Sequence, residues 1–155
     1  METSQQALQL ATKKLQIADH MTVITFPVVK DPKLLMGVAE NILEAFKQGM
    51  LCVLLHKREY QQISPFDTKN VNTIIDVFQR HITRRQNNFQ GYAATMREVK
   101  ELTEWHKKAP VEFARKNTFV MCSQRYETKE LSEKKVKEWI QSLKHFLTEV
   151  KKSVM

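Results

Sequence analysis

Glycine and proline, the residues that tight turns most often need, are scarce in this chain. Its 155 residues include only three glycines and four prolines. An all-β protein of this length contains many such turns, so the scarcity favours long helices joined by few loops. With 42% hydrophobic residues, the chain can also bury a core of its own. We therefore expect a single all-α domain over residues 1–155, folded as an up-and-down bundle of five helices.

Prolines and capping residues mark the first two helices. Apolar residues three and four apart give the first segment one helical face, and Pro27 predicts that this helix ends near Phe26. Asp31 and Pro32 predict the start of a second helix, because aspartate caps free N–H groups and proline fits the first helical turn. This second helix is apolar nearly all round, which places it at the centre of the bundle. Gly49 within it predicts a close crossing by a neighbouring helix.

Three more helices are predicted in the second half of the chain. The apolar spacing over residues 71–82 gives the third helix, and the spacing over residues 92–106 gives the fourth, which Pro110 closes or kinks. The fifth helix runs over residues 132–150, and its first residue is a capping serine.

The segment between the fourth and fifth helices has the pattern of a short β-hairpin. Residues 118–122 and residues 125–128 are two strand-like pieces on either side of Ser123 and Gln124. The sequence therefore predicts one hairpin at this end of the bundle.

Positive charge is concentrated in the middle of the chain. The formal net charge is +8, and residues 56–129 hold fourteen Lys or Arg against eight Asp or Glu. A localised positive field attracts phosphate polyanions or acidic proteins. The alternative is a soluble basic protein with no specific anionic partner.

Two stretches supply the candidate binding residues. Cationic and aromatic side chains alternate around Pro110 in residues 105–116, and further cations crowd the end of the predicted third helix. Lys and Arg suit phosphate oxygens, and Trp, His and Phe rings can stack on unpaired bases. We expect these groups to converge on one side of the bundle. The candidate nucleic-acid-binding residues are Arg80, Arg84, Arg85, Trp105, His106, Lys107, Lys108, Arg115 and Lys116.

Each of these stretches also has a purely structural explanation. Cations at the end of the third helix complement the negative end of the helix dipole. In the second stretch, Trp105, Val111 and Phe113 would anchor the segment in the core while the cations stay in water.

No sequence motif for catalysis or for a cofactor is present. The five histidines are scattered singly, without the spacing of a metal site, and three glycines are too few for a phosphate-binding loop. Cys52 and Cys122 lie in apolar runs, which is typical of reduced, buried thiols. Glu98, Glu101 and Glu104 alternate with lysines and arginines, as on a solvated helix face. We predict no catalytic residues, no metal and no cofactor, and we favour a protein that is not an enzyme.

The hydropathy pattern gives an expectation for localisation. The chain begins with polar residues, and no apolar stretch approaches the length of about 20 residues that a bilayer requires. We therefore expect a cytoplasmic protein without membrane contact.

The order of helices resembles that of the HEPN superfamily of small helical bundles, several of which cut RNA. In the nuclease members, an arginine followed four to six residues later by a histidine supplies the catalytic pair. Here Arg97 and His106 are nine residues apart and Arg80 and His81 are adjacent, so the spacing differs. The resemblance therefore implies a binding or partner module.

A second resemblance concerns the segment around Pro110. His106-Lys107-Lys108, Pro110-Val111-Glu112-Phe113 and Arg115-Lys116 are similar to runs in small archaeal proteins without an assigned activity. This resemblance implies no activity.

Charge and motifs together favour a non-catalytic basic helical module that binds RNA or another phosphate-rich polyanion. One alternative is a protein-interaction subunit for an acidic partner, with self-association as a homodimer. Another is a HEPN-type RNase with a non-standard Arg/His pair.

Overall fold

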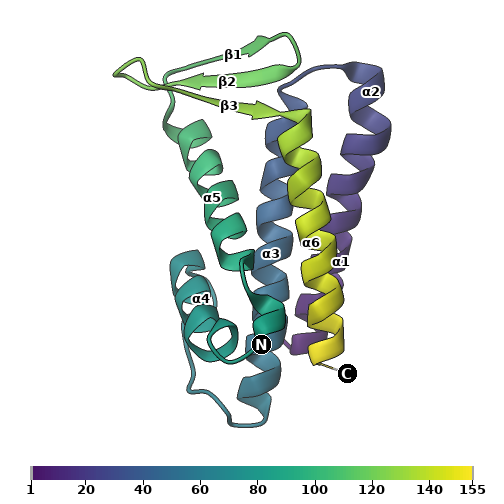
Figure 1. Cartoon of the computed structure of the whole chain (residues 1–155), viewed down its shortest axis with the longest axis vertical. Helices are drawn as coiled ribbons and strands as arrows, with labels where there is room; N and C mark the ends of the chain where they lie inside the picture. The colour runs from purple at the N-terminus through teal and green to yellow at the C-terminus, as the bar shows by residue number, and fades with distance from the viewer. Residues whose placement is uncertain (1, 155) are drawn as a thin grey trace.

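A computed structural model describes residues 2–154 of the chain. Within the described residues, five main helices form the body of the molecule, and a small antiparallel sheet lies across one end of it (Figure 1). The main helices are α1 (Ser4–His20), α3 (Leu34–Glu59), α4 (Val71–Phe78), α5 (Tyr92–Lys108) and α6 (Glu133–Ser153). The strands are β1 (Val111–Arg115), β2 (Thr118–Cys122) and β3 (Thr128–Ser132). The shorter elements are the helix α2 (Phe26–Val29), the π-helical turns η1 (Met21–Thr25) and η2 (Gln79–Thr83), and the 3₁₀ turn η3 (Asn87–Phe89).

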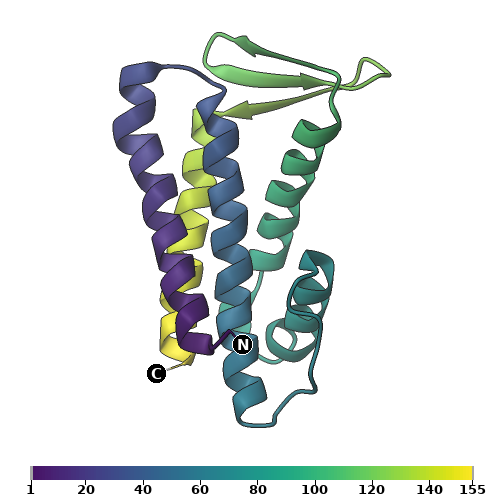
Figure 2. The ribbon, with the colours of Figure 1, turned by 180° about the vertical axis from the view of Figure 1, so that it is seen from behind.

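Helix α3 is the centre of the helical body, as its apolar sequence predicts. It contacts α1, α4, α5 and α6, and the views from the two sides show these helices arranged around it (Figures 1 and 2). Every residue from 48 to 55 is buried. Helix α3 therefore buries apolar side chains against each of these four helices.

The close crossing predicted at Gly49 is confirmed. A Cβ atom built at Gly49 would lie 2.7 Å from Cε2 of Phe146 and 2.9 Å from Cδ2 of Leu147. Both neighbours belong to α6 and are buried. The absence of a side chain at Gly49 is thus what lets α6 approach α3 so closely.

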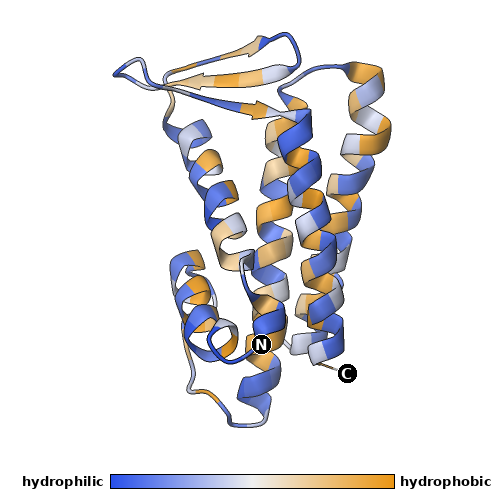
Figure 3. Cartoon of the chain, in the orientation of Figure 1, coloured by the Kyte–Doolittle hydropathy of each residue, from blue (hydrophilic) through white to orange (hydrophobic). Residues whose placement is uncertain are grey.

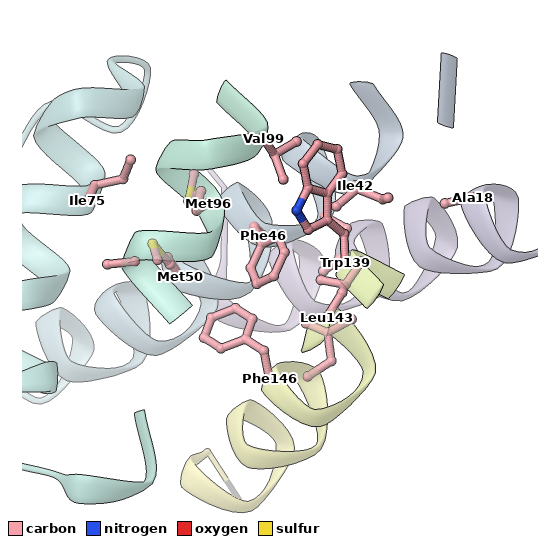
Figure 4. Packing of buried hydrophobic residues seen from close by; sticks show 14 of the residues in the cluster. Ala18, Ile42, Phe46, Met50, Ile75, Met96, Val99, Trp139, Leu143 and Phe146 are labelled. Carbon is pink, nitrogen blue, oxygen red and sulfur yellow. The ribbon is translucent and has the colours of Figure 1, made fainter. Parts of the chain in front are cut away.

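Aromatic rings fill the core between α3, α4 and α6. The rings of Phe46 and Phe146 lie 5.3 Å apart between centroids, and they face each other across the α3–α6 contact in Figure 4. Phe78 and Phe89 pack edge to face at 5.5 Å, and each also contacts Phe146 at 6.0 Å. These edge-to-face contacts match the electrostatic preference of aromatic rings.

The predicted end of the first helix at Phe26 is wrong, because helical structure continues through Pro27 to Val29. The five residues of η1 form a wider turn in which the N–H of Phe26 donates to the carbonyl of Met21. Pro27 is the second residue of α2 and follows this turn directly, so the wider turn is where the helix accommodates a residue that has no N–H group. Lys30 then ends the helix with a left-handed backbone at φ 56°.

The other predicted helix limits agree closely with the structure. The N–H of Lys33 donates to Oδ1 of Asp31 at 3.0 Å, just before α3 begins at Leu34. Ser132 caps α6, since its Oγ accepts the N–H of Lys135 at 3.1 Å. No helix within residues 2–154 is both long enough and apolar enough to cross a membrane.

The single hairpin predicted between α5 and α6 is instead a sheet of three strands in the order β1-β2-β3. β2 has the predicted bounds, but residues 123–127 form the turn, and the next strand begins at Thr128. Oγ of Ser123 accepts the N–H groups of Arg125 and Glu127, both at 3.2 Å, and this holds the turn. β1 is an additional strand, paired with β2 from Val111↔Cys122 to Arg115↔Thr118.

The two faces of the sheet differ in what they contact. Phe119 and Met121 of β2 and Leu131 of β3 are buried in the main hydrophobic cluster, so one face packs on the end of the helices. Because side chains alternate along a strand, Val111, Phe113 and Arg115 of β1 lie on the opposite face. We call that opposite side the outer face.

Candidate nucleic-acid interface

The structure places the predicted binding residues in three separate groups. Trp105, His106, Lys107 and Lys108 form the last turn of α5, which ends next to the sheet. Arg115 and Lys116 lie at the turn between β1 and β2. Arg80 lies in η2, and Arg84 and Arg85 follow it.

The η2 group lies at the other end of α5 from the sheet. Nε2 of Gln90 donates to the carbonyl of Thr83 at 2.7 Å, which holds the end of η2 beside the start of α5. Helix α5 has 17 residues, and at 1.5 Å per residue it is about 25 Å long. The structure therefore does not bring Arg80, Arg84 and Arg85 together with the cations at the sheet.

His106 is engaged in the junction between α5 and the sheet. Its Nδ1 lies 2.6 Å from Oε2 of Glu112 in β1, and its ring packs edge to face on Phe119 at 6.0 Å. These contacts give His106 a structural role. They also join the end of α5 to two neighbouring strands.

Trp105 is half-buried beneath β3. Nζ of Lys129 lies 5.9 Å from the centre of the indole and is 2.6 Å from Oε1 of Glu101. The ammonium group thus contacts both an aromatic face and a carboxylate. This arrangement fixes the position of the indole beside the last turns of α5.

The outer face of the sheet exposes an aromatic ring between cations. Phe113 is 45% exposed and Val111 is 53% exposed, so the expectation that they anchor this segment in the core is wrong. Arg115 lies on the same face as Phe113, and Lys116 follows in a tight turn at φ 55°. Val120, opposite Phe113 on β2, is buried outside the main hydrophobic cluster and forms the floor beside the ring.

The loop between β2 and β3 exposes a second aromatic ring. Tyr126 is 88% exposed and has a left-handed backbone at φ 64°, and Arg125 beside it is also exposed. Figure 3 shows this loop as hydrophilic where it projects beyond the strands. The sequence places Arg125 and Tyr126 in a strand of the expected hairpin, where they add charge and an aromatic ring to the candidate binding residues. The exposure of both side chains follows from the turn that replaces this strand.

A pocket of about 470 Å³ lies between this loop and the last turns of α5. Its walls combine an aromatic ring with charged groups of both signs. Among its lining residues are Glu101, Glu104, Trp105, Lys108, Arg125 and Glu127.

The cations at the sheet end are largely free of protein partners. Within residues 2–154, no ion pair involves Lys107, Lys108, Arg115, Lys116 or Arg125. By contrast, Glu101, Glu104 and Glu112 nearby are paired with Lys129, Lys100 and His106. Glu127 and Glu130 at this end have no ion pair either, so five unpaired cations outnumber two unpaired carboxylates within residues 2–154. The uncompensated charge at this end of the molecule is therefore mainly positive. We call these five cations, with Phe113 and Tyr126, the sheet-end surface.

The pKa of Glu104 is lowered from its ordinary value. The hydrogen bond from Nζ of Lys100, 2.5 Å from Oε1, is the main cause, and Lys107 and Lys108 add to it. Glu104 is therefore ionised at neutral pH and acts only as a hydrogen-bond acceptor.

Groups that could carry other chemistry are engaged or dispersed. Arg97 is paired with Asp76 at 3.2 Å, so it does not face His106 as a catalytic partner. Burial raises the pKa of the Cys52 thiol, which keeps it protonated. Within residues 2–154, no three His, Cys, Asp or Glu side chains are grouped as metal ligands would be.

Comparisons with protein-family models, with curated proteins and with solved structures find no match to this chain. What the sheet-end surface can bind is therefore argued from its own geometry and charge.

Proposed function

We propose that this protein binds single-stranded RNA without cutting it, and that the sheet-end surface is the binding site. One observation carries the proposal: a three-stranded antiparallel sheet exposes two aromatic rings, Phe113 and Tyr126, among five cations that have no partner in residues 2–154. Exposed rings contact bases only where the bases are unpaired, which favours a single strand over a duplex.

The two rings supply stacking that is independent of base identity. Each base–aromatic stack contributes about 1–3 kcal/mol in proteins that bind single strands. Phe113 is exposed on a face without any covering helix, and the backbone of Tyr126 is held by the turn. Both rings are thus open to a stacking base, and the turn reduces the backbone ordering that binding requires at Tyr126.

The cations supply contacts with phosphate at both ends of the sheet. Arg115 and Lys116 lie at one end of β1, and Lys107 and Lys108 come just before its other end. Val111 and Arg115 are four positions apart along β1, a distance of about 13 Å at 3.3 Å per residue. A bound oligonucleotide can contact both groups, whereas a mononucleotide cannot.

Salt dependence gives a direct test of the proposal. If five phosphates are neutralised, the logarithm of the association constant should fall with the logarithm of salt concentration at a slope of about −3.5, since each single-strand phosphate contributes about −0.7. Fluorescence anisotropy of a labelled 12-nucleotide RNA, measured between 50 and 300 mM salt, reports this slope.

A matched pair of variants locates the site. Removing two cations by Arg115→Gln with Lys116→Gln should reduce the slope by about 1.4 units. The control removes two exposed cations away from the sheet, by Lys13→Gln with Lys151→Gln, and should leave the slope nearly unchanged. Equal effects of the two pairs would mean that RNA is held by overall charge and would contradict the proposed site.

Two further outcomes separate the alternatives. Absence of RNA binding at 50 mM salt, together with nuclease-resistant capture of one acidic protein, would favour the protein-interaction subunit. Cleavage of the RNA that disappears in His106→Ala would favour the HEPN-type RNase, in which His106 must leave Glu112 to act on phosphate.

A further inference from the structure

The pocket beside the sheet-end surface has the size and the chemistry of a site for one small planar group. Its volume of about 470 Å³ falls within the range of small-ligand pockets. Two of the cations of the sheet-end surface, Lys108 and Arg125, also line this pocket. An RNA strand held by Lys108 and Arg125 can therefore reach the pocket.

Glu104 lines this pocket and, among the described residues, has one carboxylate oxygen without a hydrogen-bond donor. Its Oε1 accepts a hydrogen bond from Nζ of Lys100 at 2.5 Å, and no donor within residues 2–154 bonds to its Oε2. An ionised carboxylate accepts hydrogen bonds and donates none. A ligand group facing this oxygen must therefore carry a hydrogen.

Trp105 follows Glu104 in the chain and supplies an aromatic wall. Lys129 lies over the indole and bonds to Glu101, which keeps the ring in place at the pocket. Lys108, one helical turn after Glu104, brings a free ammonium group to the same lining. Ring, carboxylate and cation thus come from neighbouring positions on the last turns of α5.

We propose that this pocket holds one unstacked base that carries an exocyclic amino group, as cytosine, adenine and guanine do. The inference rests on the proposed binding of single-stranded RNA. The amino group donates to Oε2 of Glu104, the base lies against Trp105, and the flanking phosphates contact Lys108 and Arg125. Uracil presents a carbonyl oxygen where cytosine presents its amino group, so it places an acceptor against the carboxylate.

Two RNAs that differ at one base test this proposal. One is a chain of nine uridines, and the other is the same chain with cytidine at the central position. Because a well-placed contact to a base edge discriminates by about 1–3 kcal/mol, the cytidine RNA should bind at least about fivefold more tightly at equal salt. Anisotropy titrations of both RNAs measure this ratio.

Two glutamate variants separate the pocket from general charge. Glu104→Gln replaces an acceptor oxygen with an NH₂ donor that can satisfy uracil, so the preference for cytidine should fall to about twofold or less. Glu130→Gln removes the same charge from the exposed outer face of β3, outside the pocket, and should keep the full preference. Circular dichroism checks that both variants remain folded.

The outcomes distinguish this proposal from the one it rests on. Equal, salt-dependent binding of both RNAs, or a preference that survives Glu104→Gln, would overturn the base pocket and leave RNA binding on the sheet intact. Failure of the unaltered protein to bind either RNA at low salt would overturn both proposals.

Discussion

Replacing Gly49 by alanine tests the packing of α3 against α6. The added Cβ would lie 2.7 Å from Cε2 of Phe146 and 2.9 Å from Cδ2 of Leu147, closer than packed atoms can lie. The ring of Phe146 is fully buried among other aromatic rings, so it cannot rotate away without displacing them. Overpacking of this kind costs about 1–3 kcal/mol. The higher helix propensity of alanine offsets about 1 kcal/mol of this cost. The free energy of unfolding should therefore fall by up to about 2 kcal/mol.

Replacing Gly37 by alanine should stabilise the protein, in contrast to the same replacement at Gly49. Gly37 also lies inside α3, but its added Cβ would meet only Cε of Met21, at 3.2 Å. Cε is the free end of a flexible side chain on a half-buried residue, so it can move at low cost. Gly37→Ala should therefore keep most of the propensity gain and stabilise the protein by about 0.5–1 kcal/mol.

Urea unfolding followed by circular dichroism measures both changes. We expect the midpoint of Gly49→Ala below that of the unaltered protein and the midpoint of Gly37→Ala above it, with unchanged slopes. In thermal unfolding, each kcal/mol should shift the midpoint by about 2–4 °C for a chain of this size. A Gly49→Ala protein as stable as Gly37→Ala would refute the reasoning, because it would mean that α6 does not press on Gly49.

Three other predictions concern the candidate site and the thiols. Phe113→Ala should weaken RNA binding by about 1–3 kcal/mol at every salt concentration, because it removes a stack and no charge, and a changed salt slope would contradict that role. In the folded protein a thiol reagent should modify Cys122 before Cys52, because burial raises the pKa of Cys52 and covers it, and Cys122→Ser should abolish the faster phase. Because the pKa of Glu104 is lowered in the folded state, its pairing with Lys100 stabilises the protein at neutral pH and is lost as acid protonates the carboxylate. Lys100→Met should therefore reduce the difference between urea midpoints at pH 7 and pH 3, and an unchanged difference would argue against this pairing in solution.

The helices are the part of the fold that local patterns could predict. The apolar stripe of residues 71–82 and the capping serine at position 132 depend on residues near one another in the chain, and the structure agrees with both. The crossing at Gly49 was predictable because a glycine inside an apolar helix is itself a local signal, although the helix that crosses there is distant in sequence. The continuation of the first helix beyond Phe26 was not predictable in this way. It depends on η1, the wider turn just before Pro27, after which the helix continues past a residue without an N–H donor.

The sheet shows a second limit of local patterns. In β1 the apolar residues Val111 and Phe113 point away from the core, so hydrophobicity along the strand does not mark a buried face. Next to Pro110 and several cations, such a segment is typical of a loop. Its pairing with β2 is a tertiary property, and it is this pairing that presents Phe113 to solvent.

Proximity among the candidate binding residues is also tertiary. Trp105 to Lys108 and Arg115 to Lys116 are separated by a few residues in the sequence, and the sheet keeps them at one end of the molecule. Arg80, Arg84 and Arg85 are about as close together in the sequence as the cations at the sheet are. The length of α5 nevertheless separates them from the sheet. Composition predicts how many cations exist and not which of them can contact one ligand.

The joint between β3 and α6 has no spare length. Ser132 is both the last residue of the strand and the cap of the helix, so not one residue of slack separates the two elements. A displacement of β3 is therefore transmitted directly to the first turn of α6, because no loop residue lies between them to absorb it. Inserting even one amino acid at this joint would turn the helix by about 100° relative to the strand and force Trp139 and Phe146 off the surfaces that now receive them.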